Sequence, residues 1–390
     1  MNIKSLLLGS AAALVAVSGA RAADAVVIAE PEPMEYVRVC DVYGTGFFYI
    51  PGTETCLRVG GYIRYDIGIG ALGQQDVLDK EDFVEGGFVD ENDTYYKRAR
   101  FQLRVDSRSE TELGTLRTYA AINFQWTSSD STQNESFGGA GVTDAQDDFA
   151  IEHAYIELGG FRIGKTDSLF STFTGYAGGI INDDLVPFGP FETHQIAYTF
   201  TGGNGFSAAV ALELGDGDTG YTGLSNDFTL DSYVPHVVGG LAWTQAWGGI
   251  SAVAGYDANW EEWAGKVRLD VNATEQLALF IMGGYKSGAD DDFLGIEDLD
   301  RPNYYGNWSG DWAVWGGGTF TVSEKTKINA QVSYDEDENF AAVANVNYEL
   351  VPGLVITPEI IYVDNFDDDL DDDDDDEDEI GGFLRFQRTF

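Results

Sequence analysis

Apolar and polar residues alternate along most of the chain with a period of two. The segment from Ala99 to Val105 shows this clearly, because its odd positions are apolar and its even positions are Arg100, Gln102 and Arg104. A period of two places successive side chains on opposite faces of a β-strand. The alternation therefore predicts strands that have one apolar face and one polar face.

Sixteen such segments follow one another along the chain. Most have the ~9–11 residues with which a tilted strand crosses a bilayer. Short connections alternate with long, mostly acidic ones, apart from two short outer loops near Asn259 and Glu338. This arrangement is typical of an all-β, antiparallel transmembrane barrel with short periplasmic turns and long external loops. We expect the strands at residues 57–69, 94–107, 115–127, 149–159, 161–167, 193–202, 206–214, 234–247, 250–257, 262–272, 277–286, 310–323, 326–336, 340–350, 354–363 and 380–390.

One uncharged run, from Val237 to Tyr256, has to be weighed as a membrane-spanning helix. It contains five glycines, and Gly248-Gly249 near its middle favours a hairpin turn between two strands. We therefore assign this run to two strands of the barrel.

A sheet that spans a membrane must close on itself, because unpaired edge groups in hydrocarbon cost several kcal/mol each. A ring of about sixteen strands leaves an aqueous channel rather than a packed interior. Turning Arg98, Arg100 and Arg104 toward lipid would cost about 6–12 kcal/mol, at ~2–4 kcal/mol for each side chain. These arginines are therefore expected to line the lumen.

The connection at residues 168–192 differs from the other long loops because it is rich in apolar side chains. A loop of this composition is not expected to be exposed to water on the cell surface. We expect it to fold into the barrel and narrow the channel, with Asp183, Asp184 and Glu192 facing the remaining water. An external loop buried between subunits is the alternative. The apolar residues are Phe170, Phe173, Tyr176, Ile180, Ile181, Leu185, Val186, Phe188 and Phe191.

Basic side chains are expected on the wall opposite this loop. Arg64, Arg98 and Arg100 lie near the middle of the first two strands, and Arg104 and Arg117 lie nearer the periplasmic side. Low-dielectric walls would focus the transverse field between these arginines and the acids of the loop. Such a field orients polar solutes and disfavours apolar ones. The predicted site is therefore a filter without catalytic residues.

Both ends of the chain indicate export to the outer membrane. Residues 1–22 have a positive start at Lys4, an apolar run and an A-x-A sequence that ends at Ala22, which is typical of a cleaved signal peptide. The mature protein would comprise residues 23–390, of which 23–56 precede the barrel. The last strand ends in Phe390, and a terminal aromatic residue resembles the recognition signal of the barrel-assembly machinery.

The net charge of −44 argues against a nucleic-acid partner, because phosphate binding needs a basic surface. Aromatic residues at 13% and 48 glycines argue against a disordered acidic protein. Acidic residues are concentrated at 76–93 and 367–379, a pattern typical of surface loops. Weak Ca²⁺ binding there, bridging the lipopolysaccharide of the outer membrane, is an open alternative.

Cys40 and Cys56 are the two cysteines of the chain. In an oxidising periplasm they favour a disulfide over a metal or redox site. Two free buried thiols are the alternative.

Motifs for cofactor binding and catalysis lack their structural context. Gly68 to Gly73 fits G-x-G-x-x-G, but acidic and glycine residues follow it where a dinucleotide fold needs a helix. Residues 335–339 begin like a calcium loop, but Phe340 stands where glycine is required. No G-x-S-x-G nucleophile motif accompanies the three histidines. We therefore expect no enzymatic activity, no cofactor and no built metal site.

The stretch from Glu35 to Arg64 carries the most specific resemblance in the chain. Its cysteine spacing and its Ile-Pro-Gly-Thr-Glu-Thr-Cys run, which ends at Cys56, are similar to those of the general porins of alphaproteobacteria. The signal sequence and the C-terminal strand resemble the same family. This resemblance implies a trimeric, sixteen-stranded porin with an inward third loop, through which small hydrophilic solutes and ions diffuse passively. A channel specific for one substrate, or an adhesin, is the alternative, and the acidic run at 367–379 leaves the ion preference open.

Deletion of Phe390 tests the predicted assembly signal. We expect less protein in the outer membrane and more precursor or aggregate in the periplasm, because the assembly machinery would lose its recognition residue. Cell fractionation and immunoblotting measure this distribution, with Thr389→Ala as the neighbouring control. Normal assembly of the deletion variant at normal expression would show that the terminal aromatic is not the signal.

Overall fold

The computed structural model describes residues 38–70, 95–131, 142–215, 228–230, 232–288, 301–364 and 379–390. The predicted signal peptide at 1–22 and nearly all of the two acidic stretches lie outside these residues. Backbone contacts separate Met1–Arg38 from Val39–Phe390, and the barrel belongs to the second of these units.

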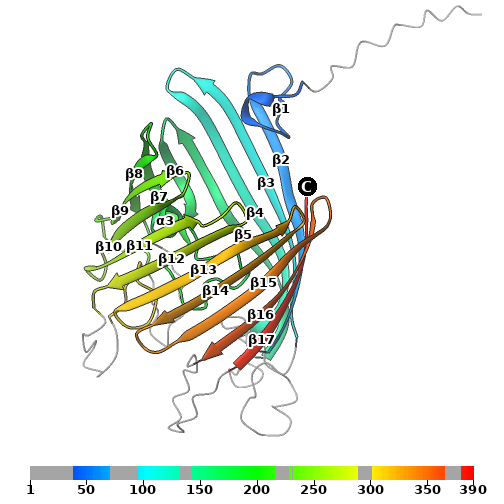
Figure 1. The fold of residues 1–390 in the computed structure, drawn as a ribbon. Coiled ribbons are helices and arrows are strands. Elements are labelled where there is room, and N and C mark those ends of the chain that lie inside the picture. Colours follow the sequence, from blue (N-terminus) through cyan, green and yellow to red (C-terminus); the bar gives the residue numbers. More distant parts are fainter. Residues whose placement is uncertain are drawn as a thin grey trace, which may run out of the picture. The chain divides into compact units, whose positions relative to one another are not determined.

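Among the described residues, sixteen strands, β2 to β17, form a closed antiparallel ring (Figure 1). Each strand pairs with the next along the chain, and β17 closes the ring on β2, from Gly381 opposite Gly70 to Thr389 opposite Tyr62. The predicted barrel is confirmed, with most strand ends displaced by only a few residues. The strands are β2 (Cys56–Gly70), β3 (Tyr96–Thr111), β4 (Gly114–Ser131), β5 (Val142–Leu158), β6 (Phe161–Asp167), β7 (Glu192–Thr201), β8 (Phe206–Glu213), β9 (His236–Gln245), β10 (Gly248–Asp257), β11 (Glu262–Asn272), β12 (Leu277–Lys286), β13 (Trp312–Ser323), β14 (Thr326–Asp335), β15 (Phe340–Val351), β16 (Leu354–Asp364) and β17 (Glu379–Thr389).

The uncharged run at 237–256 forms the hairpin of β9 and β10, as predicted. The turn itself lies two residues earlier than expected, at Ala246 and Trp247, and Gly248 and Gly249 are the first residues of β10. Gly248 has a φ of 143°, a conformation that glycine adopts without the steric cost of a Cβ. None of the helices in the described part of the chain has the length and apolar character to cross a membrane.

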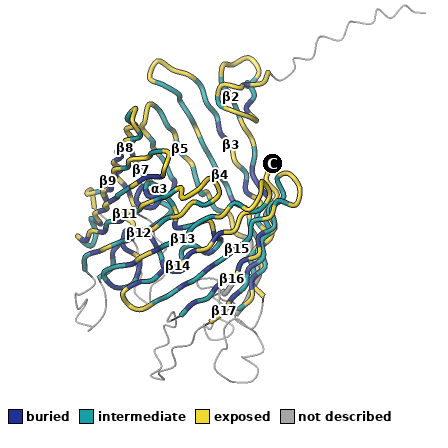
Figure 2. Tube along the Cα trace, in the orientation of Figure 1, coloured by how far each residue is buried: buried dark blue, intermediate teal, exposed yellow. Residues whose placement is uncertain are grey.

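Exposed residues alternate with less exposed ones along many of the strands (Figure 2). Because successive side chains of a strand point to opposite faces, each strand has an exposed outer face and a less exposed inner face. On β2, Ile63, Tyr65 and Ile69 are exposed, whereas Tyr62 and Asp66 are buried. Exposed aromatic side chains also mark both rims of the barrel, as they do at the two membrane interfaces of transmembrane barrels. The rim formed by the short turns carries Phe200, Phe206, Trp243, Trp247, Phe320 and Tyr348, and the rim at the opposite ends of the strands carries Tyr256, Trp263 and Tyr285.

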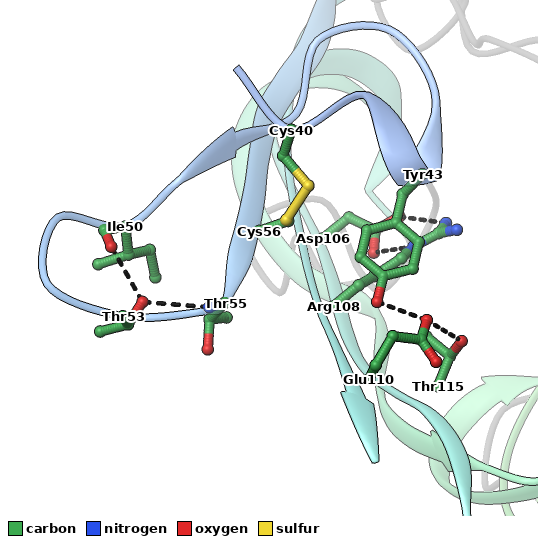
Figure 3. Close-up of a disulfide and its surroundings, with 10 residues drawn as sticks. All are labelled: Cys40, Tyr43, Ile50, Thr53, Thr55, Cys56, Asp106, Arg108, Glu110 and Thr115. Carbon is green, nitrogen blue, oxygen red and sulfur yellow. Dashed lines mark hydrogen bonds and ion pairs between the residues drawn. A yellow bond between two sulfur atoms is a disulfide. The ribbon is translucent and has the colours of Figure 1, made fainter. Parts of the chain in front are cut away.

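A disulfide joins Cys40 to Cys56 at the start of β2, with 6.0 Å between the Cα atoms (Figure 3). The predicted bridge is confirmed, and the alternative of two free thiols is excluded. The enclosed loop contains the 3-10 helix η1 (Asp41–Tyr43) and the short strand β1 (Phe48–Tyr49), which pairs with β2. The Tyr43 hydroxyl donates to Glu110 Oε1 at 2.7 Å and fastens the loop to the end of β3.

The last residue of the chain takes part in barrel closure. The backbone N–H and carbonyl of Phe390 both hydrogen-bond with Gly61 of β2, each at 3.1 Å. Its ring stacks on Phe101, with centroids 6.3 Å apart, and Phe101 stacks in turn on Phe124. Phe390 therefore extends the ladder between β17 and β2 and contributes to an aromatic row on the outer face.

A closed ladder of hydrogen bonds should resist detergent. We expect unheated protein in SDS to migrate differently from boiled protein, because unfolding requires the whole ring to open. Gel mobility before and after boiling, with circular dichroism of the unheated sample, measures this. Equal mobility together with a mainly helical spectrum would contradict the barrel.

Candidate functional site

Residues 168–191, which we call the inward loop, connect β6 to β7 and lie inside the barrel. The loop begins with the short helix α3 (Leu169–Thr174), in which the Phe170 backbone N–H donates to the side chain of the capping residue Ser168. Helix α3 packs against β8, β9, β10 and β11. A Cβ at Gly240 of β9 would collide with the ring of Phe173. The strand wall is therefore shaped to receive this helix.

A buried carboxylate anchors the beginning of the inward loop. Glu213, the last residue of β8, is 1% exposed and accepts hydrogen bonds from Ser168 Oγ and from the Leu169 backbone N–H, both at 2.8 Å. A buried carboxylate is tolerated only where hydrogen bonds compensate its loss of water. The entrance of the loop is therefore held at one defined point of the wall.

A second carboxylate anchors the middle of the loop. Glu359 of β16 accepts from the backbone N–H groups of Ile181 and Asn182, at 2.5 and 3.0 Å. It also accepts from Asn182 Nδ2 and from Asn345 Nδ2 of β15, each at 2.8 Å. Apolar contacts of Ile180 and Leu185 with β15, β16 and β17 support the same placement.

The returning half of the loop is bound by side chains that donate to its carbonyl groups. Gln331 of β14 donates to the Asp183 carbonyl at 2.8 Å, and Trp315 of β13 donates to the Val186 carbonyl at 2.8 Å. Lys266 of β11 donates to the Phe188 carbonyl. These contacts confirm the inward fold and exclude a loop buried externally between subunits.

Two of the three predicted loop acids lie together. Asp183 and Asp184 are adjacent in the middle of the inward loop, and no ion pair between described residues joins either of them to an arginine. Glu192 is instead the first residue of β7 and forms an ion pair with Lys165 of β6. It belongs to the strand wall rather than to the middle of the loop.

Two rows of polar side chains cross β17, β2 and β3 on the inner face. In the first row, the register places Asp66 between Arg385 and Arg98. Arg98 Nη2 lies 2.7 Å from the Asp66 carboxylate, and Arg385 Nε lies 2.8 Å from it. One buried carboxylate thus positions two guanidinium groups.

In the second row, Arg64 of β2 lies directly opposite Arg100 of β3. Two like charges directly opposite each other on neighbouring strands destabilise a sheet unless nearby groups compensate them. Arg64 donates to Gln387 Oε1 at 2.9 Å, and Arg100 donates to Gln125 Oε1 at 2.7 Å. We refer to Arg64, Arg98, Arg100 and Arg385 as the arginine wall.

Arg104 and Arg117 lie on the same inner face, nearer the turn that joins β3 to β4. The Arg104 guanidinium hydrogen-bonds to Gln102 and lies 5.4 Å from the centre of the Tyr62 ring. Arg117 pairs with Asp106 at 3.1 Å and with Glu157 at 2.8 Å. Arg117 is therefore neutralised locally to a greater extent than Arg104.

The inner face that carries these arginines also carries acidic side chains that were not among the residues predicted from the sequence. Asp66 and Asp106 share the strand parity of the arginines, so alternation alone could have placed them in the lumen. Glu152 could not be placed in this way, because it is the extra residue of a β-bulge: Ala121 pairs with His153, whereas Ile122 pairs with Ile151. A bulge re-aims side chains locally, and Glu152 comes within 3.5 Å of Arg100.

Comparison with known proteins identifies relatives that are porins, which agrees with the barrel geometry. Residues 24–383 match the porin subfamily. The chain is 49% identical over 392 residues to porin Omp2b of Brucella neotomae and 49% identical over 400 residues to porin Omp2a of Brucella melitensis biotype 1, with complete coverage of both chains in each case.

Solved structures share the fold at low sequence identity. The outer membrane channel DcaP of Acinetobacter baumannii superposes with a TM-score of 0.60 at 17% identity, over 88% of this chain and 99% of that one. An anion-selective porin from Comamonas acidovorans gives a TM-score of 0.51 at 12% identity, over 86% of this chain and all of that one.

The members of this family are channels rather than enzymes, and a closed barrel with a polar inner face provides the route that such a channel needs. The protein is located in the outer membrane, where it lets small hydrophilic solutes and ions diffuse passively. The chain therefore belongs to the porin family, as an alphaproteobacterial general porin.

Proposed function

We propose that diffusion is filtered between the inward loop and the arginine wall. The observation that carries this proposal is the division of the ring into two arcs. The loop is anchored on β8, β11, β13, β14 and β16, whereas the arginine wall lies on β17, β2 and β3. Solutes would then pass between the two arcs.

A hollow of about 470 Å³ supports this path. It is lined on one side by Arg64 and Arg385 of the arginine wall, and on the other by Gly179, Ile180 and Ile181 of the inward loop. The loop and the wall therefore border the same space. Walls of low dielectric constant around such a space strengthen the field of the charges that line it.

The local charge balance predicts an electrostatic filter. The arginine wall carries four positive charges, and Asp66 and Glu152 next to it carry two negative charges, which leaves an excess of two positive charges on this side. Asp183 and Asp184 supply negative charge from the loop. The field would orient polar solutes, and the protonation of the loop acids would tune the preference between anions and cations.

The outer face of β3, β4 and β5 supports assembly into homotrimers. Phe390, Phe101, Phe124 and Phe149 form a continuous exposed aromatic row, with the centroids of Phe124 and Phe149 5.3 Å apart. On the outer face of a membrane barrel, an apolar row of this kind contacts either lipid or another copy of the chain. We infer that copies of this chain meet along the row. We also propose that residues 1–22 are cleaved as a signal peptide and that the barrel-assembly machinery recognises Phe390. The outer loops would contact lipopolysaccharide.

Charge-removing substitutions on either side of the lumen test the filter. Replacing Arg98 and Arg100 by Ala should shift the selectivity toward cations, and replacing Asp183 and Asp184 by Asn should shift it toward anions. The arginine substitutions remove two positive charges, and the aspartate substitutions remove the negative charge that the two carboxyls carry at the pH of the measurement. A charge pair at ~10 Å interacts several-fold more strongly in a constriction than in bulk water. Reversal potentials across planar bilayers under a salt gradient measure the shift.

Arg162→Ala is the matched control for this experiment, because Arg162 lies at the periplasmic end of β6 and pairs with Glu157 at 2.7 Å, away from the loop. Unchanged reversal potential and conductance in both double variants would show that these residues do not border the narrow part of the channel. The barrel would remain correct in that case.

Asp183 also predicts a pH dependence. Burial raises the pKa of its carboxyl to about 7, and the charges of Asp184 and Glu359 act in the same direction. The carboxyl is therefore mostly neutral at pH 6 and mostly charged at pH 8, so cation preference should increase over this range. Reversal potentials of the native protein and of Asp183→Asn isolate this contribution. An equal pH response of both proteins would exclude Asp183 as its source.

A further inference from the structure

A second segment enters the barrel from the external end. Residues 301–311 precede β13 in a connection that the sequence predicts to be a long external loop. In the structure Tyr304, Tyr305 and Trp308 are each at most 2% exposed. The Tyr304 backbone N–H donates to Asp257 Oδ2 of β10 at 2.9 Å, and Lys286 Nζ of β12 donates to the Trp308 carbonyl at 2.7 Å. The segment is therefore bound to the inner face of the wall.

Glycines at inward positions of the strands make room for these aromatic rings. A Cβ at Gly255 of β10 would lie 2.5 Å from the ring of Tyr305, and a Cβ at Gly284 of β12 would lie 2.9 Å from the ring of Trp308. Real Cβ atoms do not tolerate contacts this short. The glycines of the wall therefore define where the segment packs. Gly240 defines the position of the Phe173 ring in the same way.

The second segment and the inward loop hold each other. Tyr305 donates its hydroxyl proton to Glu213 Oε2 at 3.1 Å, and Glu213 is the carboxylate that also binds Ser168 and Leu169. The rings of Tyr305 and Phe170 lie 5.2 Å apart. Glu213 therefore binds both the beginning of the inward loop and Tyr305 of the second segment.

Apolar packing fills the space between these two segments and the wall. A single buried cluster contains Phe170 and Phe188 of the inward loop, Tyr304, Tyr305 and Trp308 of the second segment, and Val253, Met282 and Trp315 of β10, β12 and β13. Apolar clusters of buried side chains exclude water and polar solutes. In contrast, the hollow beside Arg64 and Arg385 is lined by Asn345, Asn347 and Thr357.

We propose that residues 301–311 seal the external half of the lumen along β8–β13 and clamp the entrance of the inward loop, so that solutes pass only beside the arginine wall. This inference rests on the proposed function and deepens it, because it restricts the permeation path to one side of the barrel. It also assigns Tyr305 and Glu213 as positioning residues for the filter.

Reaction of introduced thiols with a small cationic methanethiosulfonate reagent tests the seal. The native cysteines are bridged, so a new cysteine is the one thiol that can react in folded protein. Val253→Cys places it on the inner face of β10, within the sealed region, and Asn347→Cys places it in the hollow. We expect the Asn347→Cys thiol to react at least about tenfold faster, since reactivity requires access to solvent.

Opening the seal should then expose the buried position. In the Val253→Cys background, Gly255→Ala should displace the Tyr305 ring and accelerate labelling about tenfold. Gly239→Ala on β9 is the matched control, because a Cβ there meets no atom within 4 Å. Tyr305→Ala provides a second route to the same opening. Heat-dependent mobility on SDS gels verifies that each variant is folded.

Equal labelling rates of Val253→Cys and Asn347→Cys in otherwise native protein would overturn the seal. So would a Gly255→Ala variant that is folded and labels no faster than the Gly239→Ala control. Neither outcome depends on ion selectivity. Failure of the seal can therefore be distinguished from failure of the arginine filter, which is measured by reversal potentials.

Discussion

The rest of the structure depends on the requirement that backbone N–H and carbonyl groups in hydrocarbon be paired. A sheet with free edges cannot meet this requirement, so the sixteen strands close into a ring. Closure separates the side chains into a lipid-facing set and a lumen-facing set. It also brings the two ends of the chain together, since β17 pairs with β2 and Phe390 pairs with Gly61.

Inside the ring, one side of the wall carries charged and polar side chains, and the other side is covered by packed apolar side chains. On β17, β2 and β3, arginines share carboxylates and amides, and their charges are only partly compensated. On β8 to β13, aromatic rings from the inward loop and from residues 301–311 pack against glycines of the wall. Buried Glu213 is stable there because hydrogen bonds from Ser168, Leu169 and Tyr305 replace its water. The barrel therefore combines a polar wall with a packed one.

The alternation of residues was sufficient to predict most of the fold. It located the sixteen strands, and the cost of placing Arg98, Arg100 and Arg104 in lipid assigned the inner face. The apolar composition of residues 168–192 indicated that this loop folds inward, which its hydrogen bonds to Glu359 and Glu213 confirm. Two cysteines in an exported chain indicated the disulfide. Each of these inferences uses only local pattern and the physics of the membrane.

The sequence by itself therefore determined which segments cross the membrane, which side chains face lipid and which loop is too apolar for the surface. Only the tertiary structure decided the partners inside the lumen. Asp66 meets Arg385 across 319 positions of the chain, Ile181 meets Glu359 across 178, and Tyr305 meets Glu213 across 92. A period of two specifies the face of the sheet on which a side chain lies, but not the register of the strands or the residue that the side chain contacts. A bulge such as that at Glu152 shifts the alternation by one residue and leaves no sign in the amino-acid composition. Closure of the ring fixes these partners, because it sets distant strands side by side.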